Sequence, residues 1–242
     1  GVNVERIKSS IPFVGLHAHS VAGSVFDGFG YPQDHMDFAY KNGMGALALT
    51  DHGNMNGLAY QITHAKKMKE AGKEFKPIFG VEAYFVPSVE KWKEEYEQAK
   101  LDKKKARTLS TDDKVAAEDE NASKTKTKNK INARRHLVLL AQNQVGLNNL
   151  FKIISASHQG DNFYRYPRVD YKLLEECGEG VIASSACLGG VYAGDYWDNR
   201  DNGEEAVLSA MRETSSRMTS ILGNRWLAEL QWNNVPEQHT LN

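Results

Sequence analysis

The feature of this sequence that most limits its fold is the alternation of apolar runs with helix-like segments. Residues 44–50 are an unbroken run of small and apolar residues, as expected of a parallel strand that is buried on both faces. A helix is predicted before it at 32–42, where Pro32 suits the first turn and Gly43 the C-terminal end. A second helix is predicted at 58–71. This alternation predicts an α/β fold with parallel strands.

The same rhythm continues along the chain. Further strands are predicted at 13–17, 77–84, 135–141, 180–184 and 225–231, and further helices at 146–158, 171–177 and 203–222. The segment Phe163–Arg168 is predicted to be an aromatic loop.

Two histidines follow the first predicted strand. Alternate residues of a strand project to the same side, so His17 and His19 are expected to converge on one point. Two neutral imidazoles at one point can hold a divalent metal ion. Two hydrogen-bonded loop histidines remain the alternative at this stage.

Other potential ligands also follow predicted strands. In parallel α/β folds the functional loops gather at the C-terminal ends of the strands. This shared position favours a metal site more strongly than any single residue does. The residues at or just beyond such ends are His17, His19, Asp27, His52 and Glu82.

A charged insertion interrupts the α/β rhythm at about 88–134 in what we expect to be one domain over 1–242. Residues 91–135 hold 14 Lys/Arg and 9 Asp/Glu, although the whole chain has a net charge of −1. Ser88 can cap a charged helix that runs to Lys105. The remainder is too poor in apolar groups to offset its ordering entropy, which predicts a mobile surface segment. A solvated insertion and a basic arm that touches nucleic-acid phosphates are both open.

Composition narrows the class of protein. No apolar run is long enough to cross a bilayer and no leader is visible, so we expect a cytoplasmic protein without a membrane partner. Cys177 and Cys187 are too few for a disulfide framework, and each is by default a buried thiol. The uniform basicity of a simple nucleic-acid-binding module is absent.

The order of several motifs is recognisable. H-A-H-S and F-D-G are followed by A-L-T-D-H-G-N-M-N-G, G-V-E-A-Y, H-L-V-L-L-A-Q-N and S-A-C-L-G-G. This series closely resembles the PHP (polymerase and histidinol phosphatase) domain of bacterial C-family replicative polymerases, the DNA polymerase III alpha subunits. The resemblance implies a distorted seven-stranded (β/α) barrel with a metal cluster at the C-terminal strand ends.

The resemblance also implies a ligand set for up to three divalent ions. His17 and His19 match a pair on the first metal, Asp27 and His52 match ligands of a second, Glu82 matches a bridging carboxylate, and His136 and Cys187 match the pair on a third. Imidazole, carboxylate and thiolate suit Zn²⁺, Mn²⁺ or Fe²⁺, with Mg²⁺ possible.

In this family the cluster implies phosphoester hydrolysis, and in the polymerase branch it implies a 3′–5′ proofreading exonuclease. The expected partners are the 3′ end of DNA, the remainder of a DNA-directed DNA polymerase and other replisome subunits. The alternative is a catalytically silent scaffold that docks partner proteins. A free-standing small-molecule phosphatase fits less well, because T-D-H-G-N-M-N-G and P-E-Q are typical of the polymerases.

Further residues are expected to serve catalysis or substrate binding. Asp51 is expected to orient a ligand rather than to bind metal itself. Arg168 and Arg165, beside Tyr164 and Tyr166, can contact phosphate and bases, although a purely structural loop is equally compatible with the pattern.

Two departures from the family pattern stand out. The segment between His19 and Asp27 is one residue longer, which leaves the direction of Asp27 open. The Asp-x-His pair that the family carries on its seventh strand is not found, so we expect the last barrel strand to be missing and metal binding to be weak.

Overall fold

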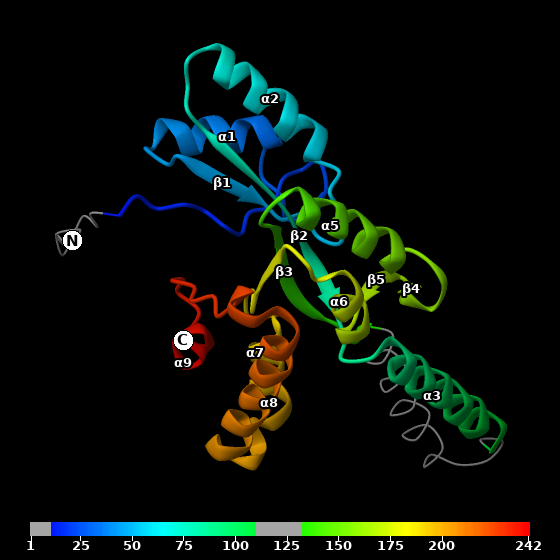
Figure 1. The fold of residues 1–242 in the computed structure, drawn as a ribbon. Coiled ribbons are helices and arrows are strands. Elements are labelled where there is room, and N and C mark those ends of the chain that lie inside the picture. The colour runs from blue at the N-terminus through cyan, green and yellow to red at the C-terminus, as the bar shows by residue number, and fades with distance from the viewer. Residues whose placement is uncertain (1–10, 110–131) are drawn as a thin grey trace. The chain divides into compact units, whose positions relative to one another are not determined.

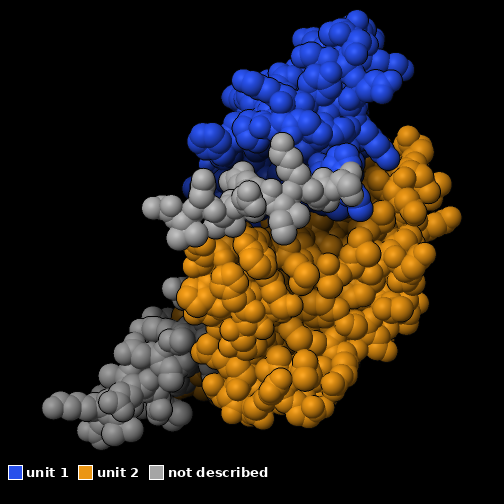
Figure 2. Space-filling view, turned by 90° about the vertical axis from the view of Figure 1, so that its left-hand side faces the viewer, with its two compact units in different colours: residues 1–81 blue, residues 82–242 orange. Residues whose placement is uncertain are grey.

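The computed structural model describes residues 11–109 and 132–242. The chain divides into two compact units, residues 1–81 and residues 82–242, which Figure 2 shows in separate colours. The boundary falls inside one strand, β2 (Lys76–Phe85). Each unit is described by itself.

Unit 1 is built from α1 (Pro32–Lys41), β1 (Ala46–Leu49), α2 (Leu58–Glu70) and the first part of β2. Figure 1 shows α1 beside β1, with α2 beside α1. Strand β1 pairs in parallel with β2, as the alternating pattern predicts. A small core forms from buried Ala39, Leu47 and Leu49, with Ala18, Met44 and Phe75 packed against it.

The prediction of a regular strand at 13–17 is wrong. Only an isolated parallel bridge joins Gly15 to Leu47. The segment still runs beside β1, because Ala48 donates to the carbonyl oxygen of Gly15 at 2.8 Å and Thr50 donates to that of Ala18 at 2.8 Å. The Thr50 hydroxyl also accepts from the backbone N–H of Ala18 at 3.2 Å, so a side chain replaces part of the backbone ladder. The histidine segment is thereby anchored without a regular strand.

Unit 2 contains the remaining elements, and no helix in the described residues is long and apolar enough to span a membrane. Its helices are α3 (Val89–Leu109), α5 (Gln144–Ser157), α6 (Tyr171–Cys177), α7 (Val191–Asn199), α8 (Glu204–Leu222) and α9 (Pro236–Leu241). Its strands after β2 are β3 (Arg135–Ala141), β4 (Phe163–Tyr164), β5 (Tyr166–Val169), β6 (Val181–Ser184) and β7 (Trp226–Leu227). Three short 3₁₀ turns cover Gly160–Asn162, Arg200–Asn202 and Gly223–Arg225.

The sheet of unit 2 is mixed, so the expectation of parallel strands throughout is wrong. Its strand order is β4-β5-β2-β3-β6-β7. Strand β3 pairs with β6 in the antiparallel sense, whereas β2 with β5 and β6 with β7 are parallel. The α/β class is confirmed, and closure into a seven-stranded barrel with a missing last strand stays a prediction.

Two regions of unit 2 differ from the predicted element order. The expected aromatic loop is a tight hairpin, β4–β5, whose strands pair Tyr164 with Tyr166. Helix α7 is absent from the predicted elements, because glycines such as Gly190 and Gly194 are more typical of loops than of helices. A side chain at Gly194 would overlap Arg135, which explains a glycine inside this helix.

The first part of the charged insertion packs against unit 2. Helix α3 is capped as expected, because the Ser88 hydroxyl accepts from the backbone N–H of Lys91 at 3.2 Å. Its residues Val89, Trp92 and Tyr96 are buried in a cluster with Val86. The helix predicted from Ser88 to Lys105 is thus confirmed, and it extends to Leu109. Its packing through Val89, Trp92 and Tyr96 is not evident from the sequence, because these apolar positions are interspersed with charged ones. The expected mobile stretch at 110–131 lies outside the described residues.

Close backbone contact fixes α5 against the turn that leads into β6. The Asn143 side chain caps α5 by accepting from the backbone N–H of Gly146 at 2.9 Å. The backbone N–H of Gln142 donates to the carbonyl oxygen of Gly180 at 2.9 Å. A Cβ on Gly146 would overlap this same carbonyl group. Glycine is therefore required for the approach of helix to turn.

We predict that Gly146→Ala lowers the free energy of unfolding by about 1–3 kcal/mol, because the new methyl group must displace backbone. Urea unfolding followed by circular dichroism measures the change. Gly45→Ala is the matched control, because nothing lies within 4 Å of its added Cβ. Equal stability of the two variants would contradict the assigned contact.

Candidate metal centre

Three predicted ligands meet within unit 1. His52 Nε2 lies 2.7 Å from Asp27 Oδ2, and His19 Nδ1 lies 3.4 Å from the same oxygen. One ligand atom from each of these three side chains lies within 4.8 Å of the others. Two imidazoles and one carboxylate, with Asp27 half-exposed, form a donor set that fits a divalent transition metal.

His17 lies beside this group. Its ring centroid is 5.2 Å from that of His19, in an edge-to-face arrangement, and the rings of His19 and His52 are 4.2 Å apart. The prediction that the two histidines of the H-x-H pair lie close together is confirmed. The longer loop before Asp27 does not carry this carboxylate away from the histidines.

A buried carboxylate organises the backbone around this group. Asp51 is 3% exposed. Its Oδ1 accepts from the backbone N–H of Ser20 at 2.6 Å and from the Ser24 hydroxyl at 2.9 Å, and its Oδ2 accepts from the Ser20 hydroxyl at 2.8 Å. Ser24 Oγ in turn accepts from the backbone N–H of His52 at 3.1 Å. Asp51 thus connects the loop after His19 to the His52 segment.

This network contains residues that the sequence analysis did not single out. Ser20 and Ser24 are both buried polar residues in a loop whose composition indicated only turns. The one signal available was their position between two potential ligands, His19 and Asp27. The role of Asp51 in orienting a ligand stays a prediction, and its contacts reach the backbone of His52 through Ser24.

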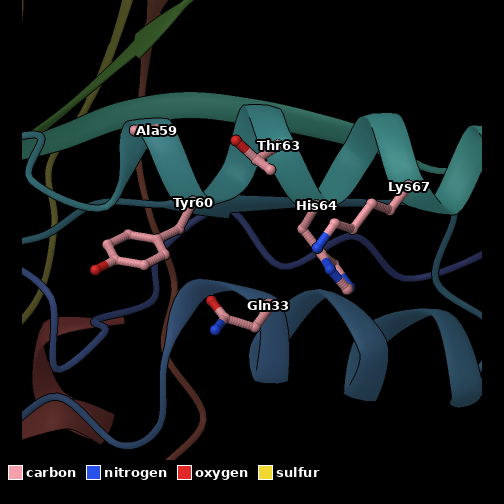
Figure 3. Close-up of a pocket in the computed structure, with 6 residues that line it drawn as sticks. All are labelled: Gln33, Ala59, Tyr60, Thr63, His64 and Lys67. Carbon is pink, nitrogen blue, oxygen red and sulfur yellow. The ribbon is translucent and has the colours of Figure 1, made fainter.

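A separate cleft lies between α1 and α2 of unit 1 (Figure 3). It is lined by Gln33, Ala59, Tyr60, Thr63, His64 and Lys67. His64 Nε2 lies 2.8 Å from Asp37 Oδ1, a hydrogen bond that joins the two helices. None of the predicted metal ligands lines this cleft. We therefore assign His64 a structural role.

Three more predicted ligands meet within unit 2. His136 Nδ1 lies 2.9 Å from Glu82 Oε1, and Glu82 is fully buried. Cys187 Sγ lies 3.4 Å from His136 Nδ1 and 3.8 Å from Glu82 Oε1. Imidazole, carboxylate and thiol together fit a divalent ion with affinity for nitrogen and sulfur, such as Zn²⁺.

A tight turn places Cys187 beside His136. Ala186 adopts a left-handed conformation with φ of 58°, and Gly190 donates to the carbonyl oxygen of Cys187 at 2.7 Å. A Cβ on Gly190 would overlap the carbonyl oxygen of Ser185, so only glycine closes this turn. The backbone N–H of His136 donates to Gly189 O at 2.8 Å, which joins the turn to β3.

Two effects of opposite sign act on the His136 imidazole. Burial lowers its pKa, but hydrogen bonds to Cys187 and Glu82 outweigh burial and raise the pKa to about 9. The imidazole is consequently protonated at neutral pH in the metal-free protein. A metal ion held by this imidazole would have to displace the proton.

Arg168 is fully buried in unit 2. Its guanidinium donates to the carbonyl oxygens of Ala133 at 3.1 Å and Tyr164 at 2.8 Å, and it lies 3.7 Å from the Trp92 ring centroid. Burial, helped by Arg134, lowers its pKa to about 10, so it stays charged at neutral pH. These contacts give Arg168 a structural role in place of the phosphate contact that its sequence context suggested.

The predicted nucleic-acid-binding residues occupy the β4–β5 hairpin. Arg165 is exposed and connects Tyr164 to Tyr166 with a positive φ of 60°. Tyr164 is 41% exposed, whereas Tyr166 is partly covered by Arg134, whose guanidinium lies 3.9 Å from its ring centroid. Tyr164 also packs against Tyr96, and a hydrogen bond from Tyr96 lowers the pKa of Tyr164. Arg165 and Tyr164 are the members of this group that solvent reaches most readily.

Comparison with known proteins yields consistent matches. The PHP domain family matches residues 15–231. A DNA polymerase III subunit alpha from Aquifex aeolicus is 33% identical over 95% of this chain and 16% of its own length. The subunit from Borreliella burgdorferi is 31% identical over 95% of this chain and 16% of its own length, and that from Deinococcus radiodurans is 30% identical over 93% and 14%. The chain thus spans about one sixth of the length of these relatives.

We predict that Asp51→Asn destabilises the protein by about 1.5–3 kcal/mol, because buried hydrogen bonds to a charged carboxylate are weakened. Urea unfolding measures this loss. Asp37→Asn is the control: its carboxylate is also paired but its side chain is 54% exposed, so less than about 1 kcal/mol is expected. A stability unchanged in Asp51→Asn would show that the carboxylate does not organise the loop.

Proposed function

The chain belongs to the PHP domain family, and from this premise we propose that it is the PHP domain of a DNA polymerase III alpha subunit that hydrolyses phosphoester bonds of DNA with divalent metal ions. The proposed reaction is the removal of nucleotides from a 3′ end, as in proofreading. Identity of 30–33% to three alpha subunits supports the polymerase branch of the family.

The observation that carries the proposal is the convergence of ligand-type side chains in each unit. His19, Asp27 and His52 meet in unit 1, and Glu82, His136 and Cys187 meet in unit 2. With His17, these are the seven positions that match the ligand pattern of the family. A chain that kept the domain only as a scaffold would not need all of these residue types at these positions.

Most of these side chains are proposed to bind the metal ions, and Asp51 is proposed to orient a ligand. When bound, divalent ions lower the pKa of water and neutralise negative charge that develops on a phosphate. Asp27 and Glu82 supply negative charge to retain the ions, and His19, His52 and His136 supply neutral nitrogen ligands. Asp51 holds the backbone of the His52 segment and limits its motion during the reaction.

Substrate contact is proposed for the exposed hairpin of unit 2. Tyr164 offers a π-face to a base, and Arg165 offers a charge to a phosphate. Tyr166 supports the hairpin through its contact with Arg134. The proposed ions are Zn²⁺, Mn²⁺ or Fe²⁺, and the proposed partners are DNA, the remainder of the polymerase and other replisome subunits in the cytoplasm.

We predict that the intact alpha subunit that contains this chain releases 3′ nucleotides from single-stranded DNA in Mn²⁺ or Zn²⁺, and that Glu82→Ala and His52→Ala each reduce the rate by at least about 100-fold, because each removes a proposed metal ligand. The release of labelled nucleotides measures the rate, and bound metal is measured in the same samples.

His64→Ala is the matched control for this prediction. His64 pairs with Asp37 at 2.8 Å and lines a cleft that contains none of the predicted ligands, so its loss leaves the rate unchanged. A folded, metal-loaded subunit with no release above that of the ligand variants would contradict the nuclease function and leave a scaffold.

We further predict a thiolate ligand in unit 2. Co²⁺ bound to the wild-type chain shows a near-ultraviolet thiolate-to-metal charge-transfer band, and Cys187→Ser removes it. Cys177→Ser retains the band, because Cys177 closes α6 apart from the ligands and burial raises the pKa of its thiol. Loss of the band in Cys177→Ser alone would refute the assignment of Cys187.

A further inference from the structure

The loop that carries Asp27 also presents apolar side chains to solvent. Phe26 is fully exposed and Phe29 is 91% exposed. Val25, in the same loop, is 76% exposed. An exposed aromatic side chain forgoes about 1.5–3 kcal/mol of burial free energy, and contiguous exposed apolar groups usually mark a binding surface.

Backbone contacts hold this loop in one conformation. The Val21 N–H donates to Gly30 O at 2.9 Å, which closes the loop, and the Gly28 N–H donates to Ser24 O at 2.6 Å. A Cβ on Gly28 would overlap the backbone of Ser20 and Ser24, so the turn between the two phenylalanines is tightly packed. The aromatic rings are therefore displayed by a rigid element.

Both phenylalanines lie close in the sequence to Asp27, a proposed metal ligand. Phe26 directly precedes Asp27, at a Cα separation of about 3.8 Å, and Phe29 follows it by two residues, at no more than about 7 Å. In a nucleotide, phosphate and base are likewise separated by a single sugar. A phosphate at the His19–Asp27–His52 group would leave its base within reach of these rings.

We propose that Phe26 and Phe29 form a stacking platform for the terminal base of a single-stranded DNA substrate. The inference rests on the proposed function and adds residues of unit 1 that bind the terminal base. Stacking on an aromatic ring suits an exonuclease, because every base has a π-face and each nucleotide type must be removed. The described part of unit 1 carries no excess of positive charge, so base stacking supplies the contact that lysine and arginine would otherwise make.

The test compares two hydrolysis-resistant oligonucleotides, each with a 5′ fluorophore and a terminal phosphorothioate linkage. One ends in thymidine and the other in an abasic deoxyribose. Fluorescence anisotropy with the 242-residue chain in Mn²⁺ gives both dissociation constants. We expect the wild-type chain to bind the base-ended strand about tenfold more tightly, in line with stacking energies of single bases.

The variants separate stacking from effects on the fold. Phe26→Ala and Phe29→Ala are expected to weaken binding of the base-ended strand and to leave the abasic strand unchanged, and Phe26→Trp retains the preference. Phe38→Ala is the matched control, because Phe38 is 65% exposed on α1 outside this loop and its loss leaves both constants unchanged.

Three results would overturn the platform: no preference in the wild-type chain, a preference that survives in the Phe26→Ala/Phe29→Ala double variant, or equal weakening of both strands. The first two would leave these side chains as a contact for another protein. If the preference is present and depends on the phenylalanines but no nucleotide is released in the hydrolysis assay, the platform stands and the hydrolytic function fails.

Discussion

The hydrogen bonds of the buried Asp51 carboxylate hold together the part of unit 1 that carries the candidate metal ligands. The carboxylate is almost wholly buried, and hydrogen bonds from Ser20 and Ser24 satisfy both of its oxygens. Because Ser24 also accepts from the backbone of His52, one charge fixes the loop that begins after His19 and the turn that follows β1. A buried carboxylate is stable only when donors surround it, so the loop must fold around Asp51. The ligand group and the displayed aromatic rings are both consequences of that requirement.

In unit 2 the candidate ligands are brought together by different interactions. Its ligand trio is assembled by backbone packing: a left-handed Ala186 and a sterically required Gly190 direct Cys187 toward His136. Glu82 is fully buried, and its Oε1 lies 2.9 Å from His136 Nδ1 and 3.8 Å from the Cys187 sulfur. In the metal-free protein, the positive charge of the His136 imidazole offsets the charge of Glu82.

The candidate ligands could be proposed from the sequence because the motifs that contain them are dense and several of them lie in or just after a predicted strand. The buried run of β1 located His52, and β2 located Glu82. Strand direction could not be predicted, because a strand buried on both faces reads alike whether its neighbour is parallel or antiparallel, as β3 and β6 show. The β4–β5 hairpin was missed because Arg165 occupies a left-handed position where glycine is the usual signal. The burial of Arg168 depends on Trp92, which lies 76 positions away in the chain and is brought near only by the fold.

Contacts that form only in the folded chain also explain why Phe26 and Phe29 could not be identified as candidate site residues from the sequence. A metal ligand is defined by its chemistry, so histidine and aspartate at a strand end point to their function directly. A phenylalanine is by default a core residue, and only its exposure reveals another use. Phe26 and Phe29 stay exposed because Gly28 and the Ser24 contact turn the chain away from the small core of unit 1. The contacts that organise the loop of the candidate ligands thus also leave these rings facing solvent, and the proposed substrate, which carries both a phosphate and a planar base, is complementary to that combination.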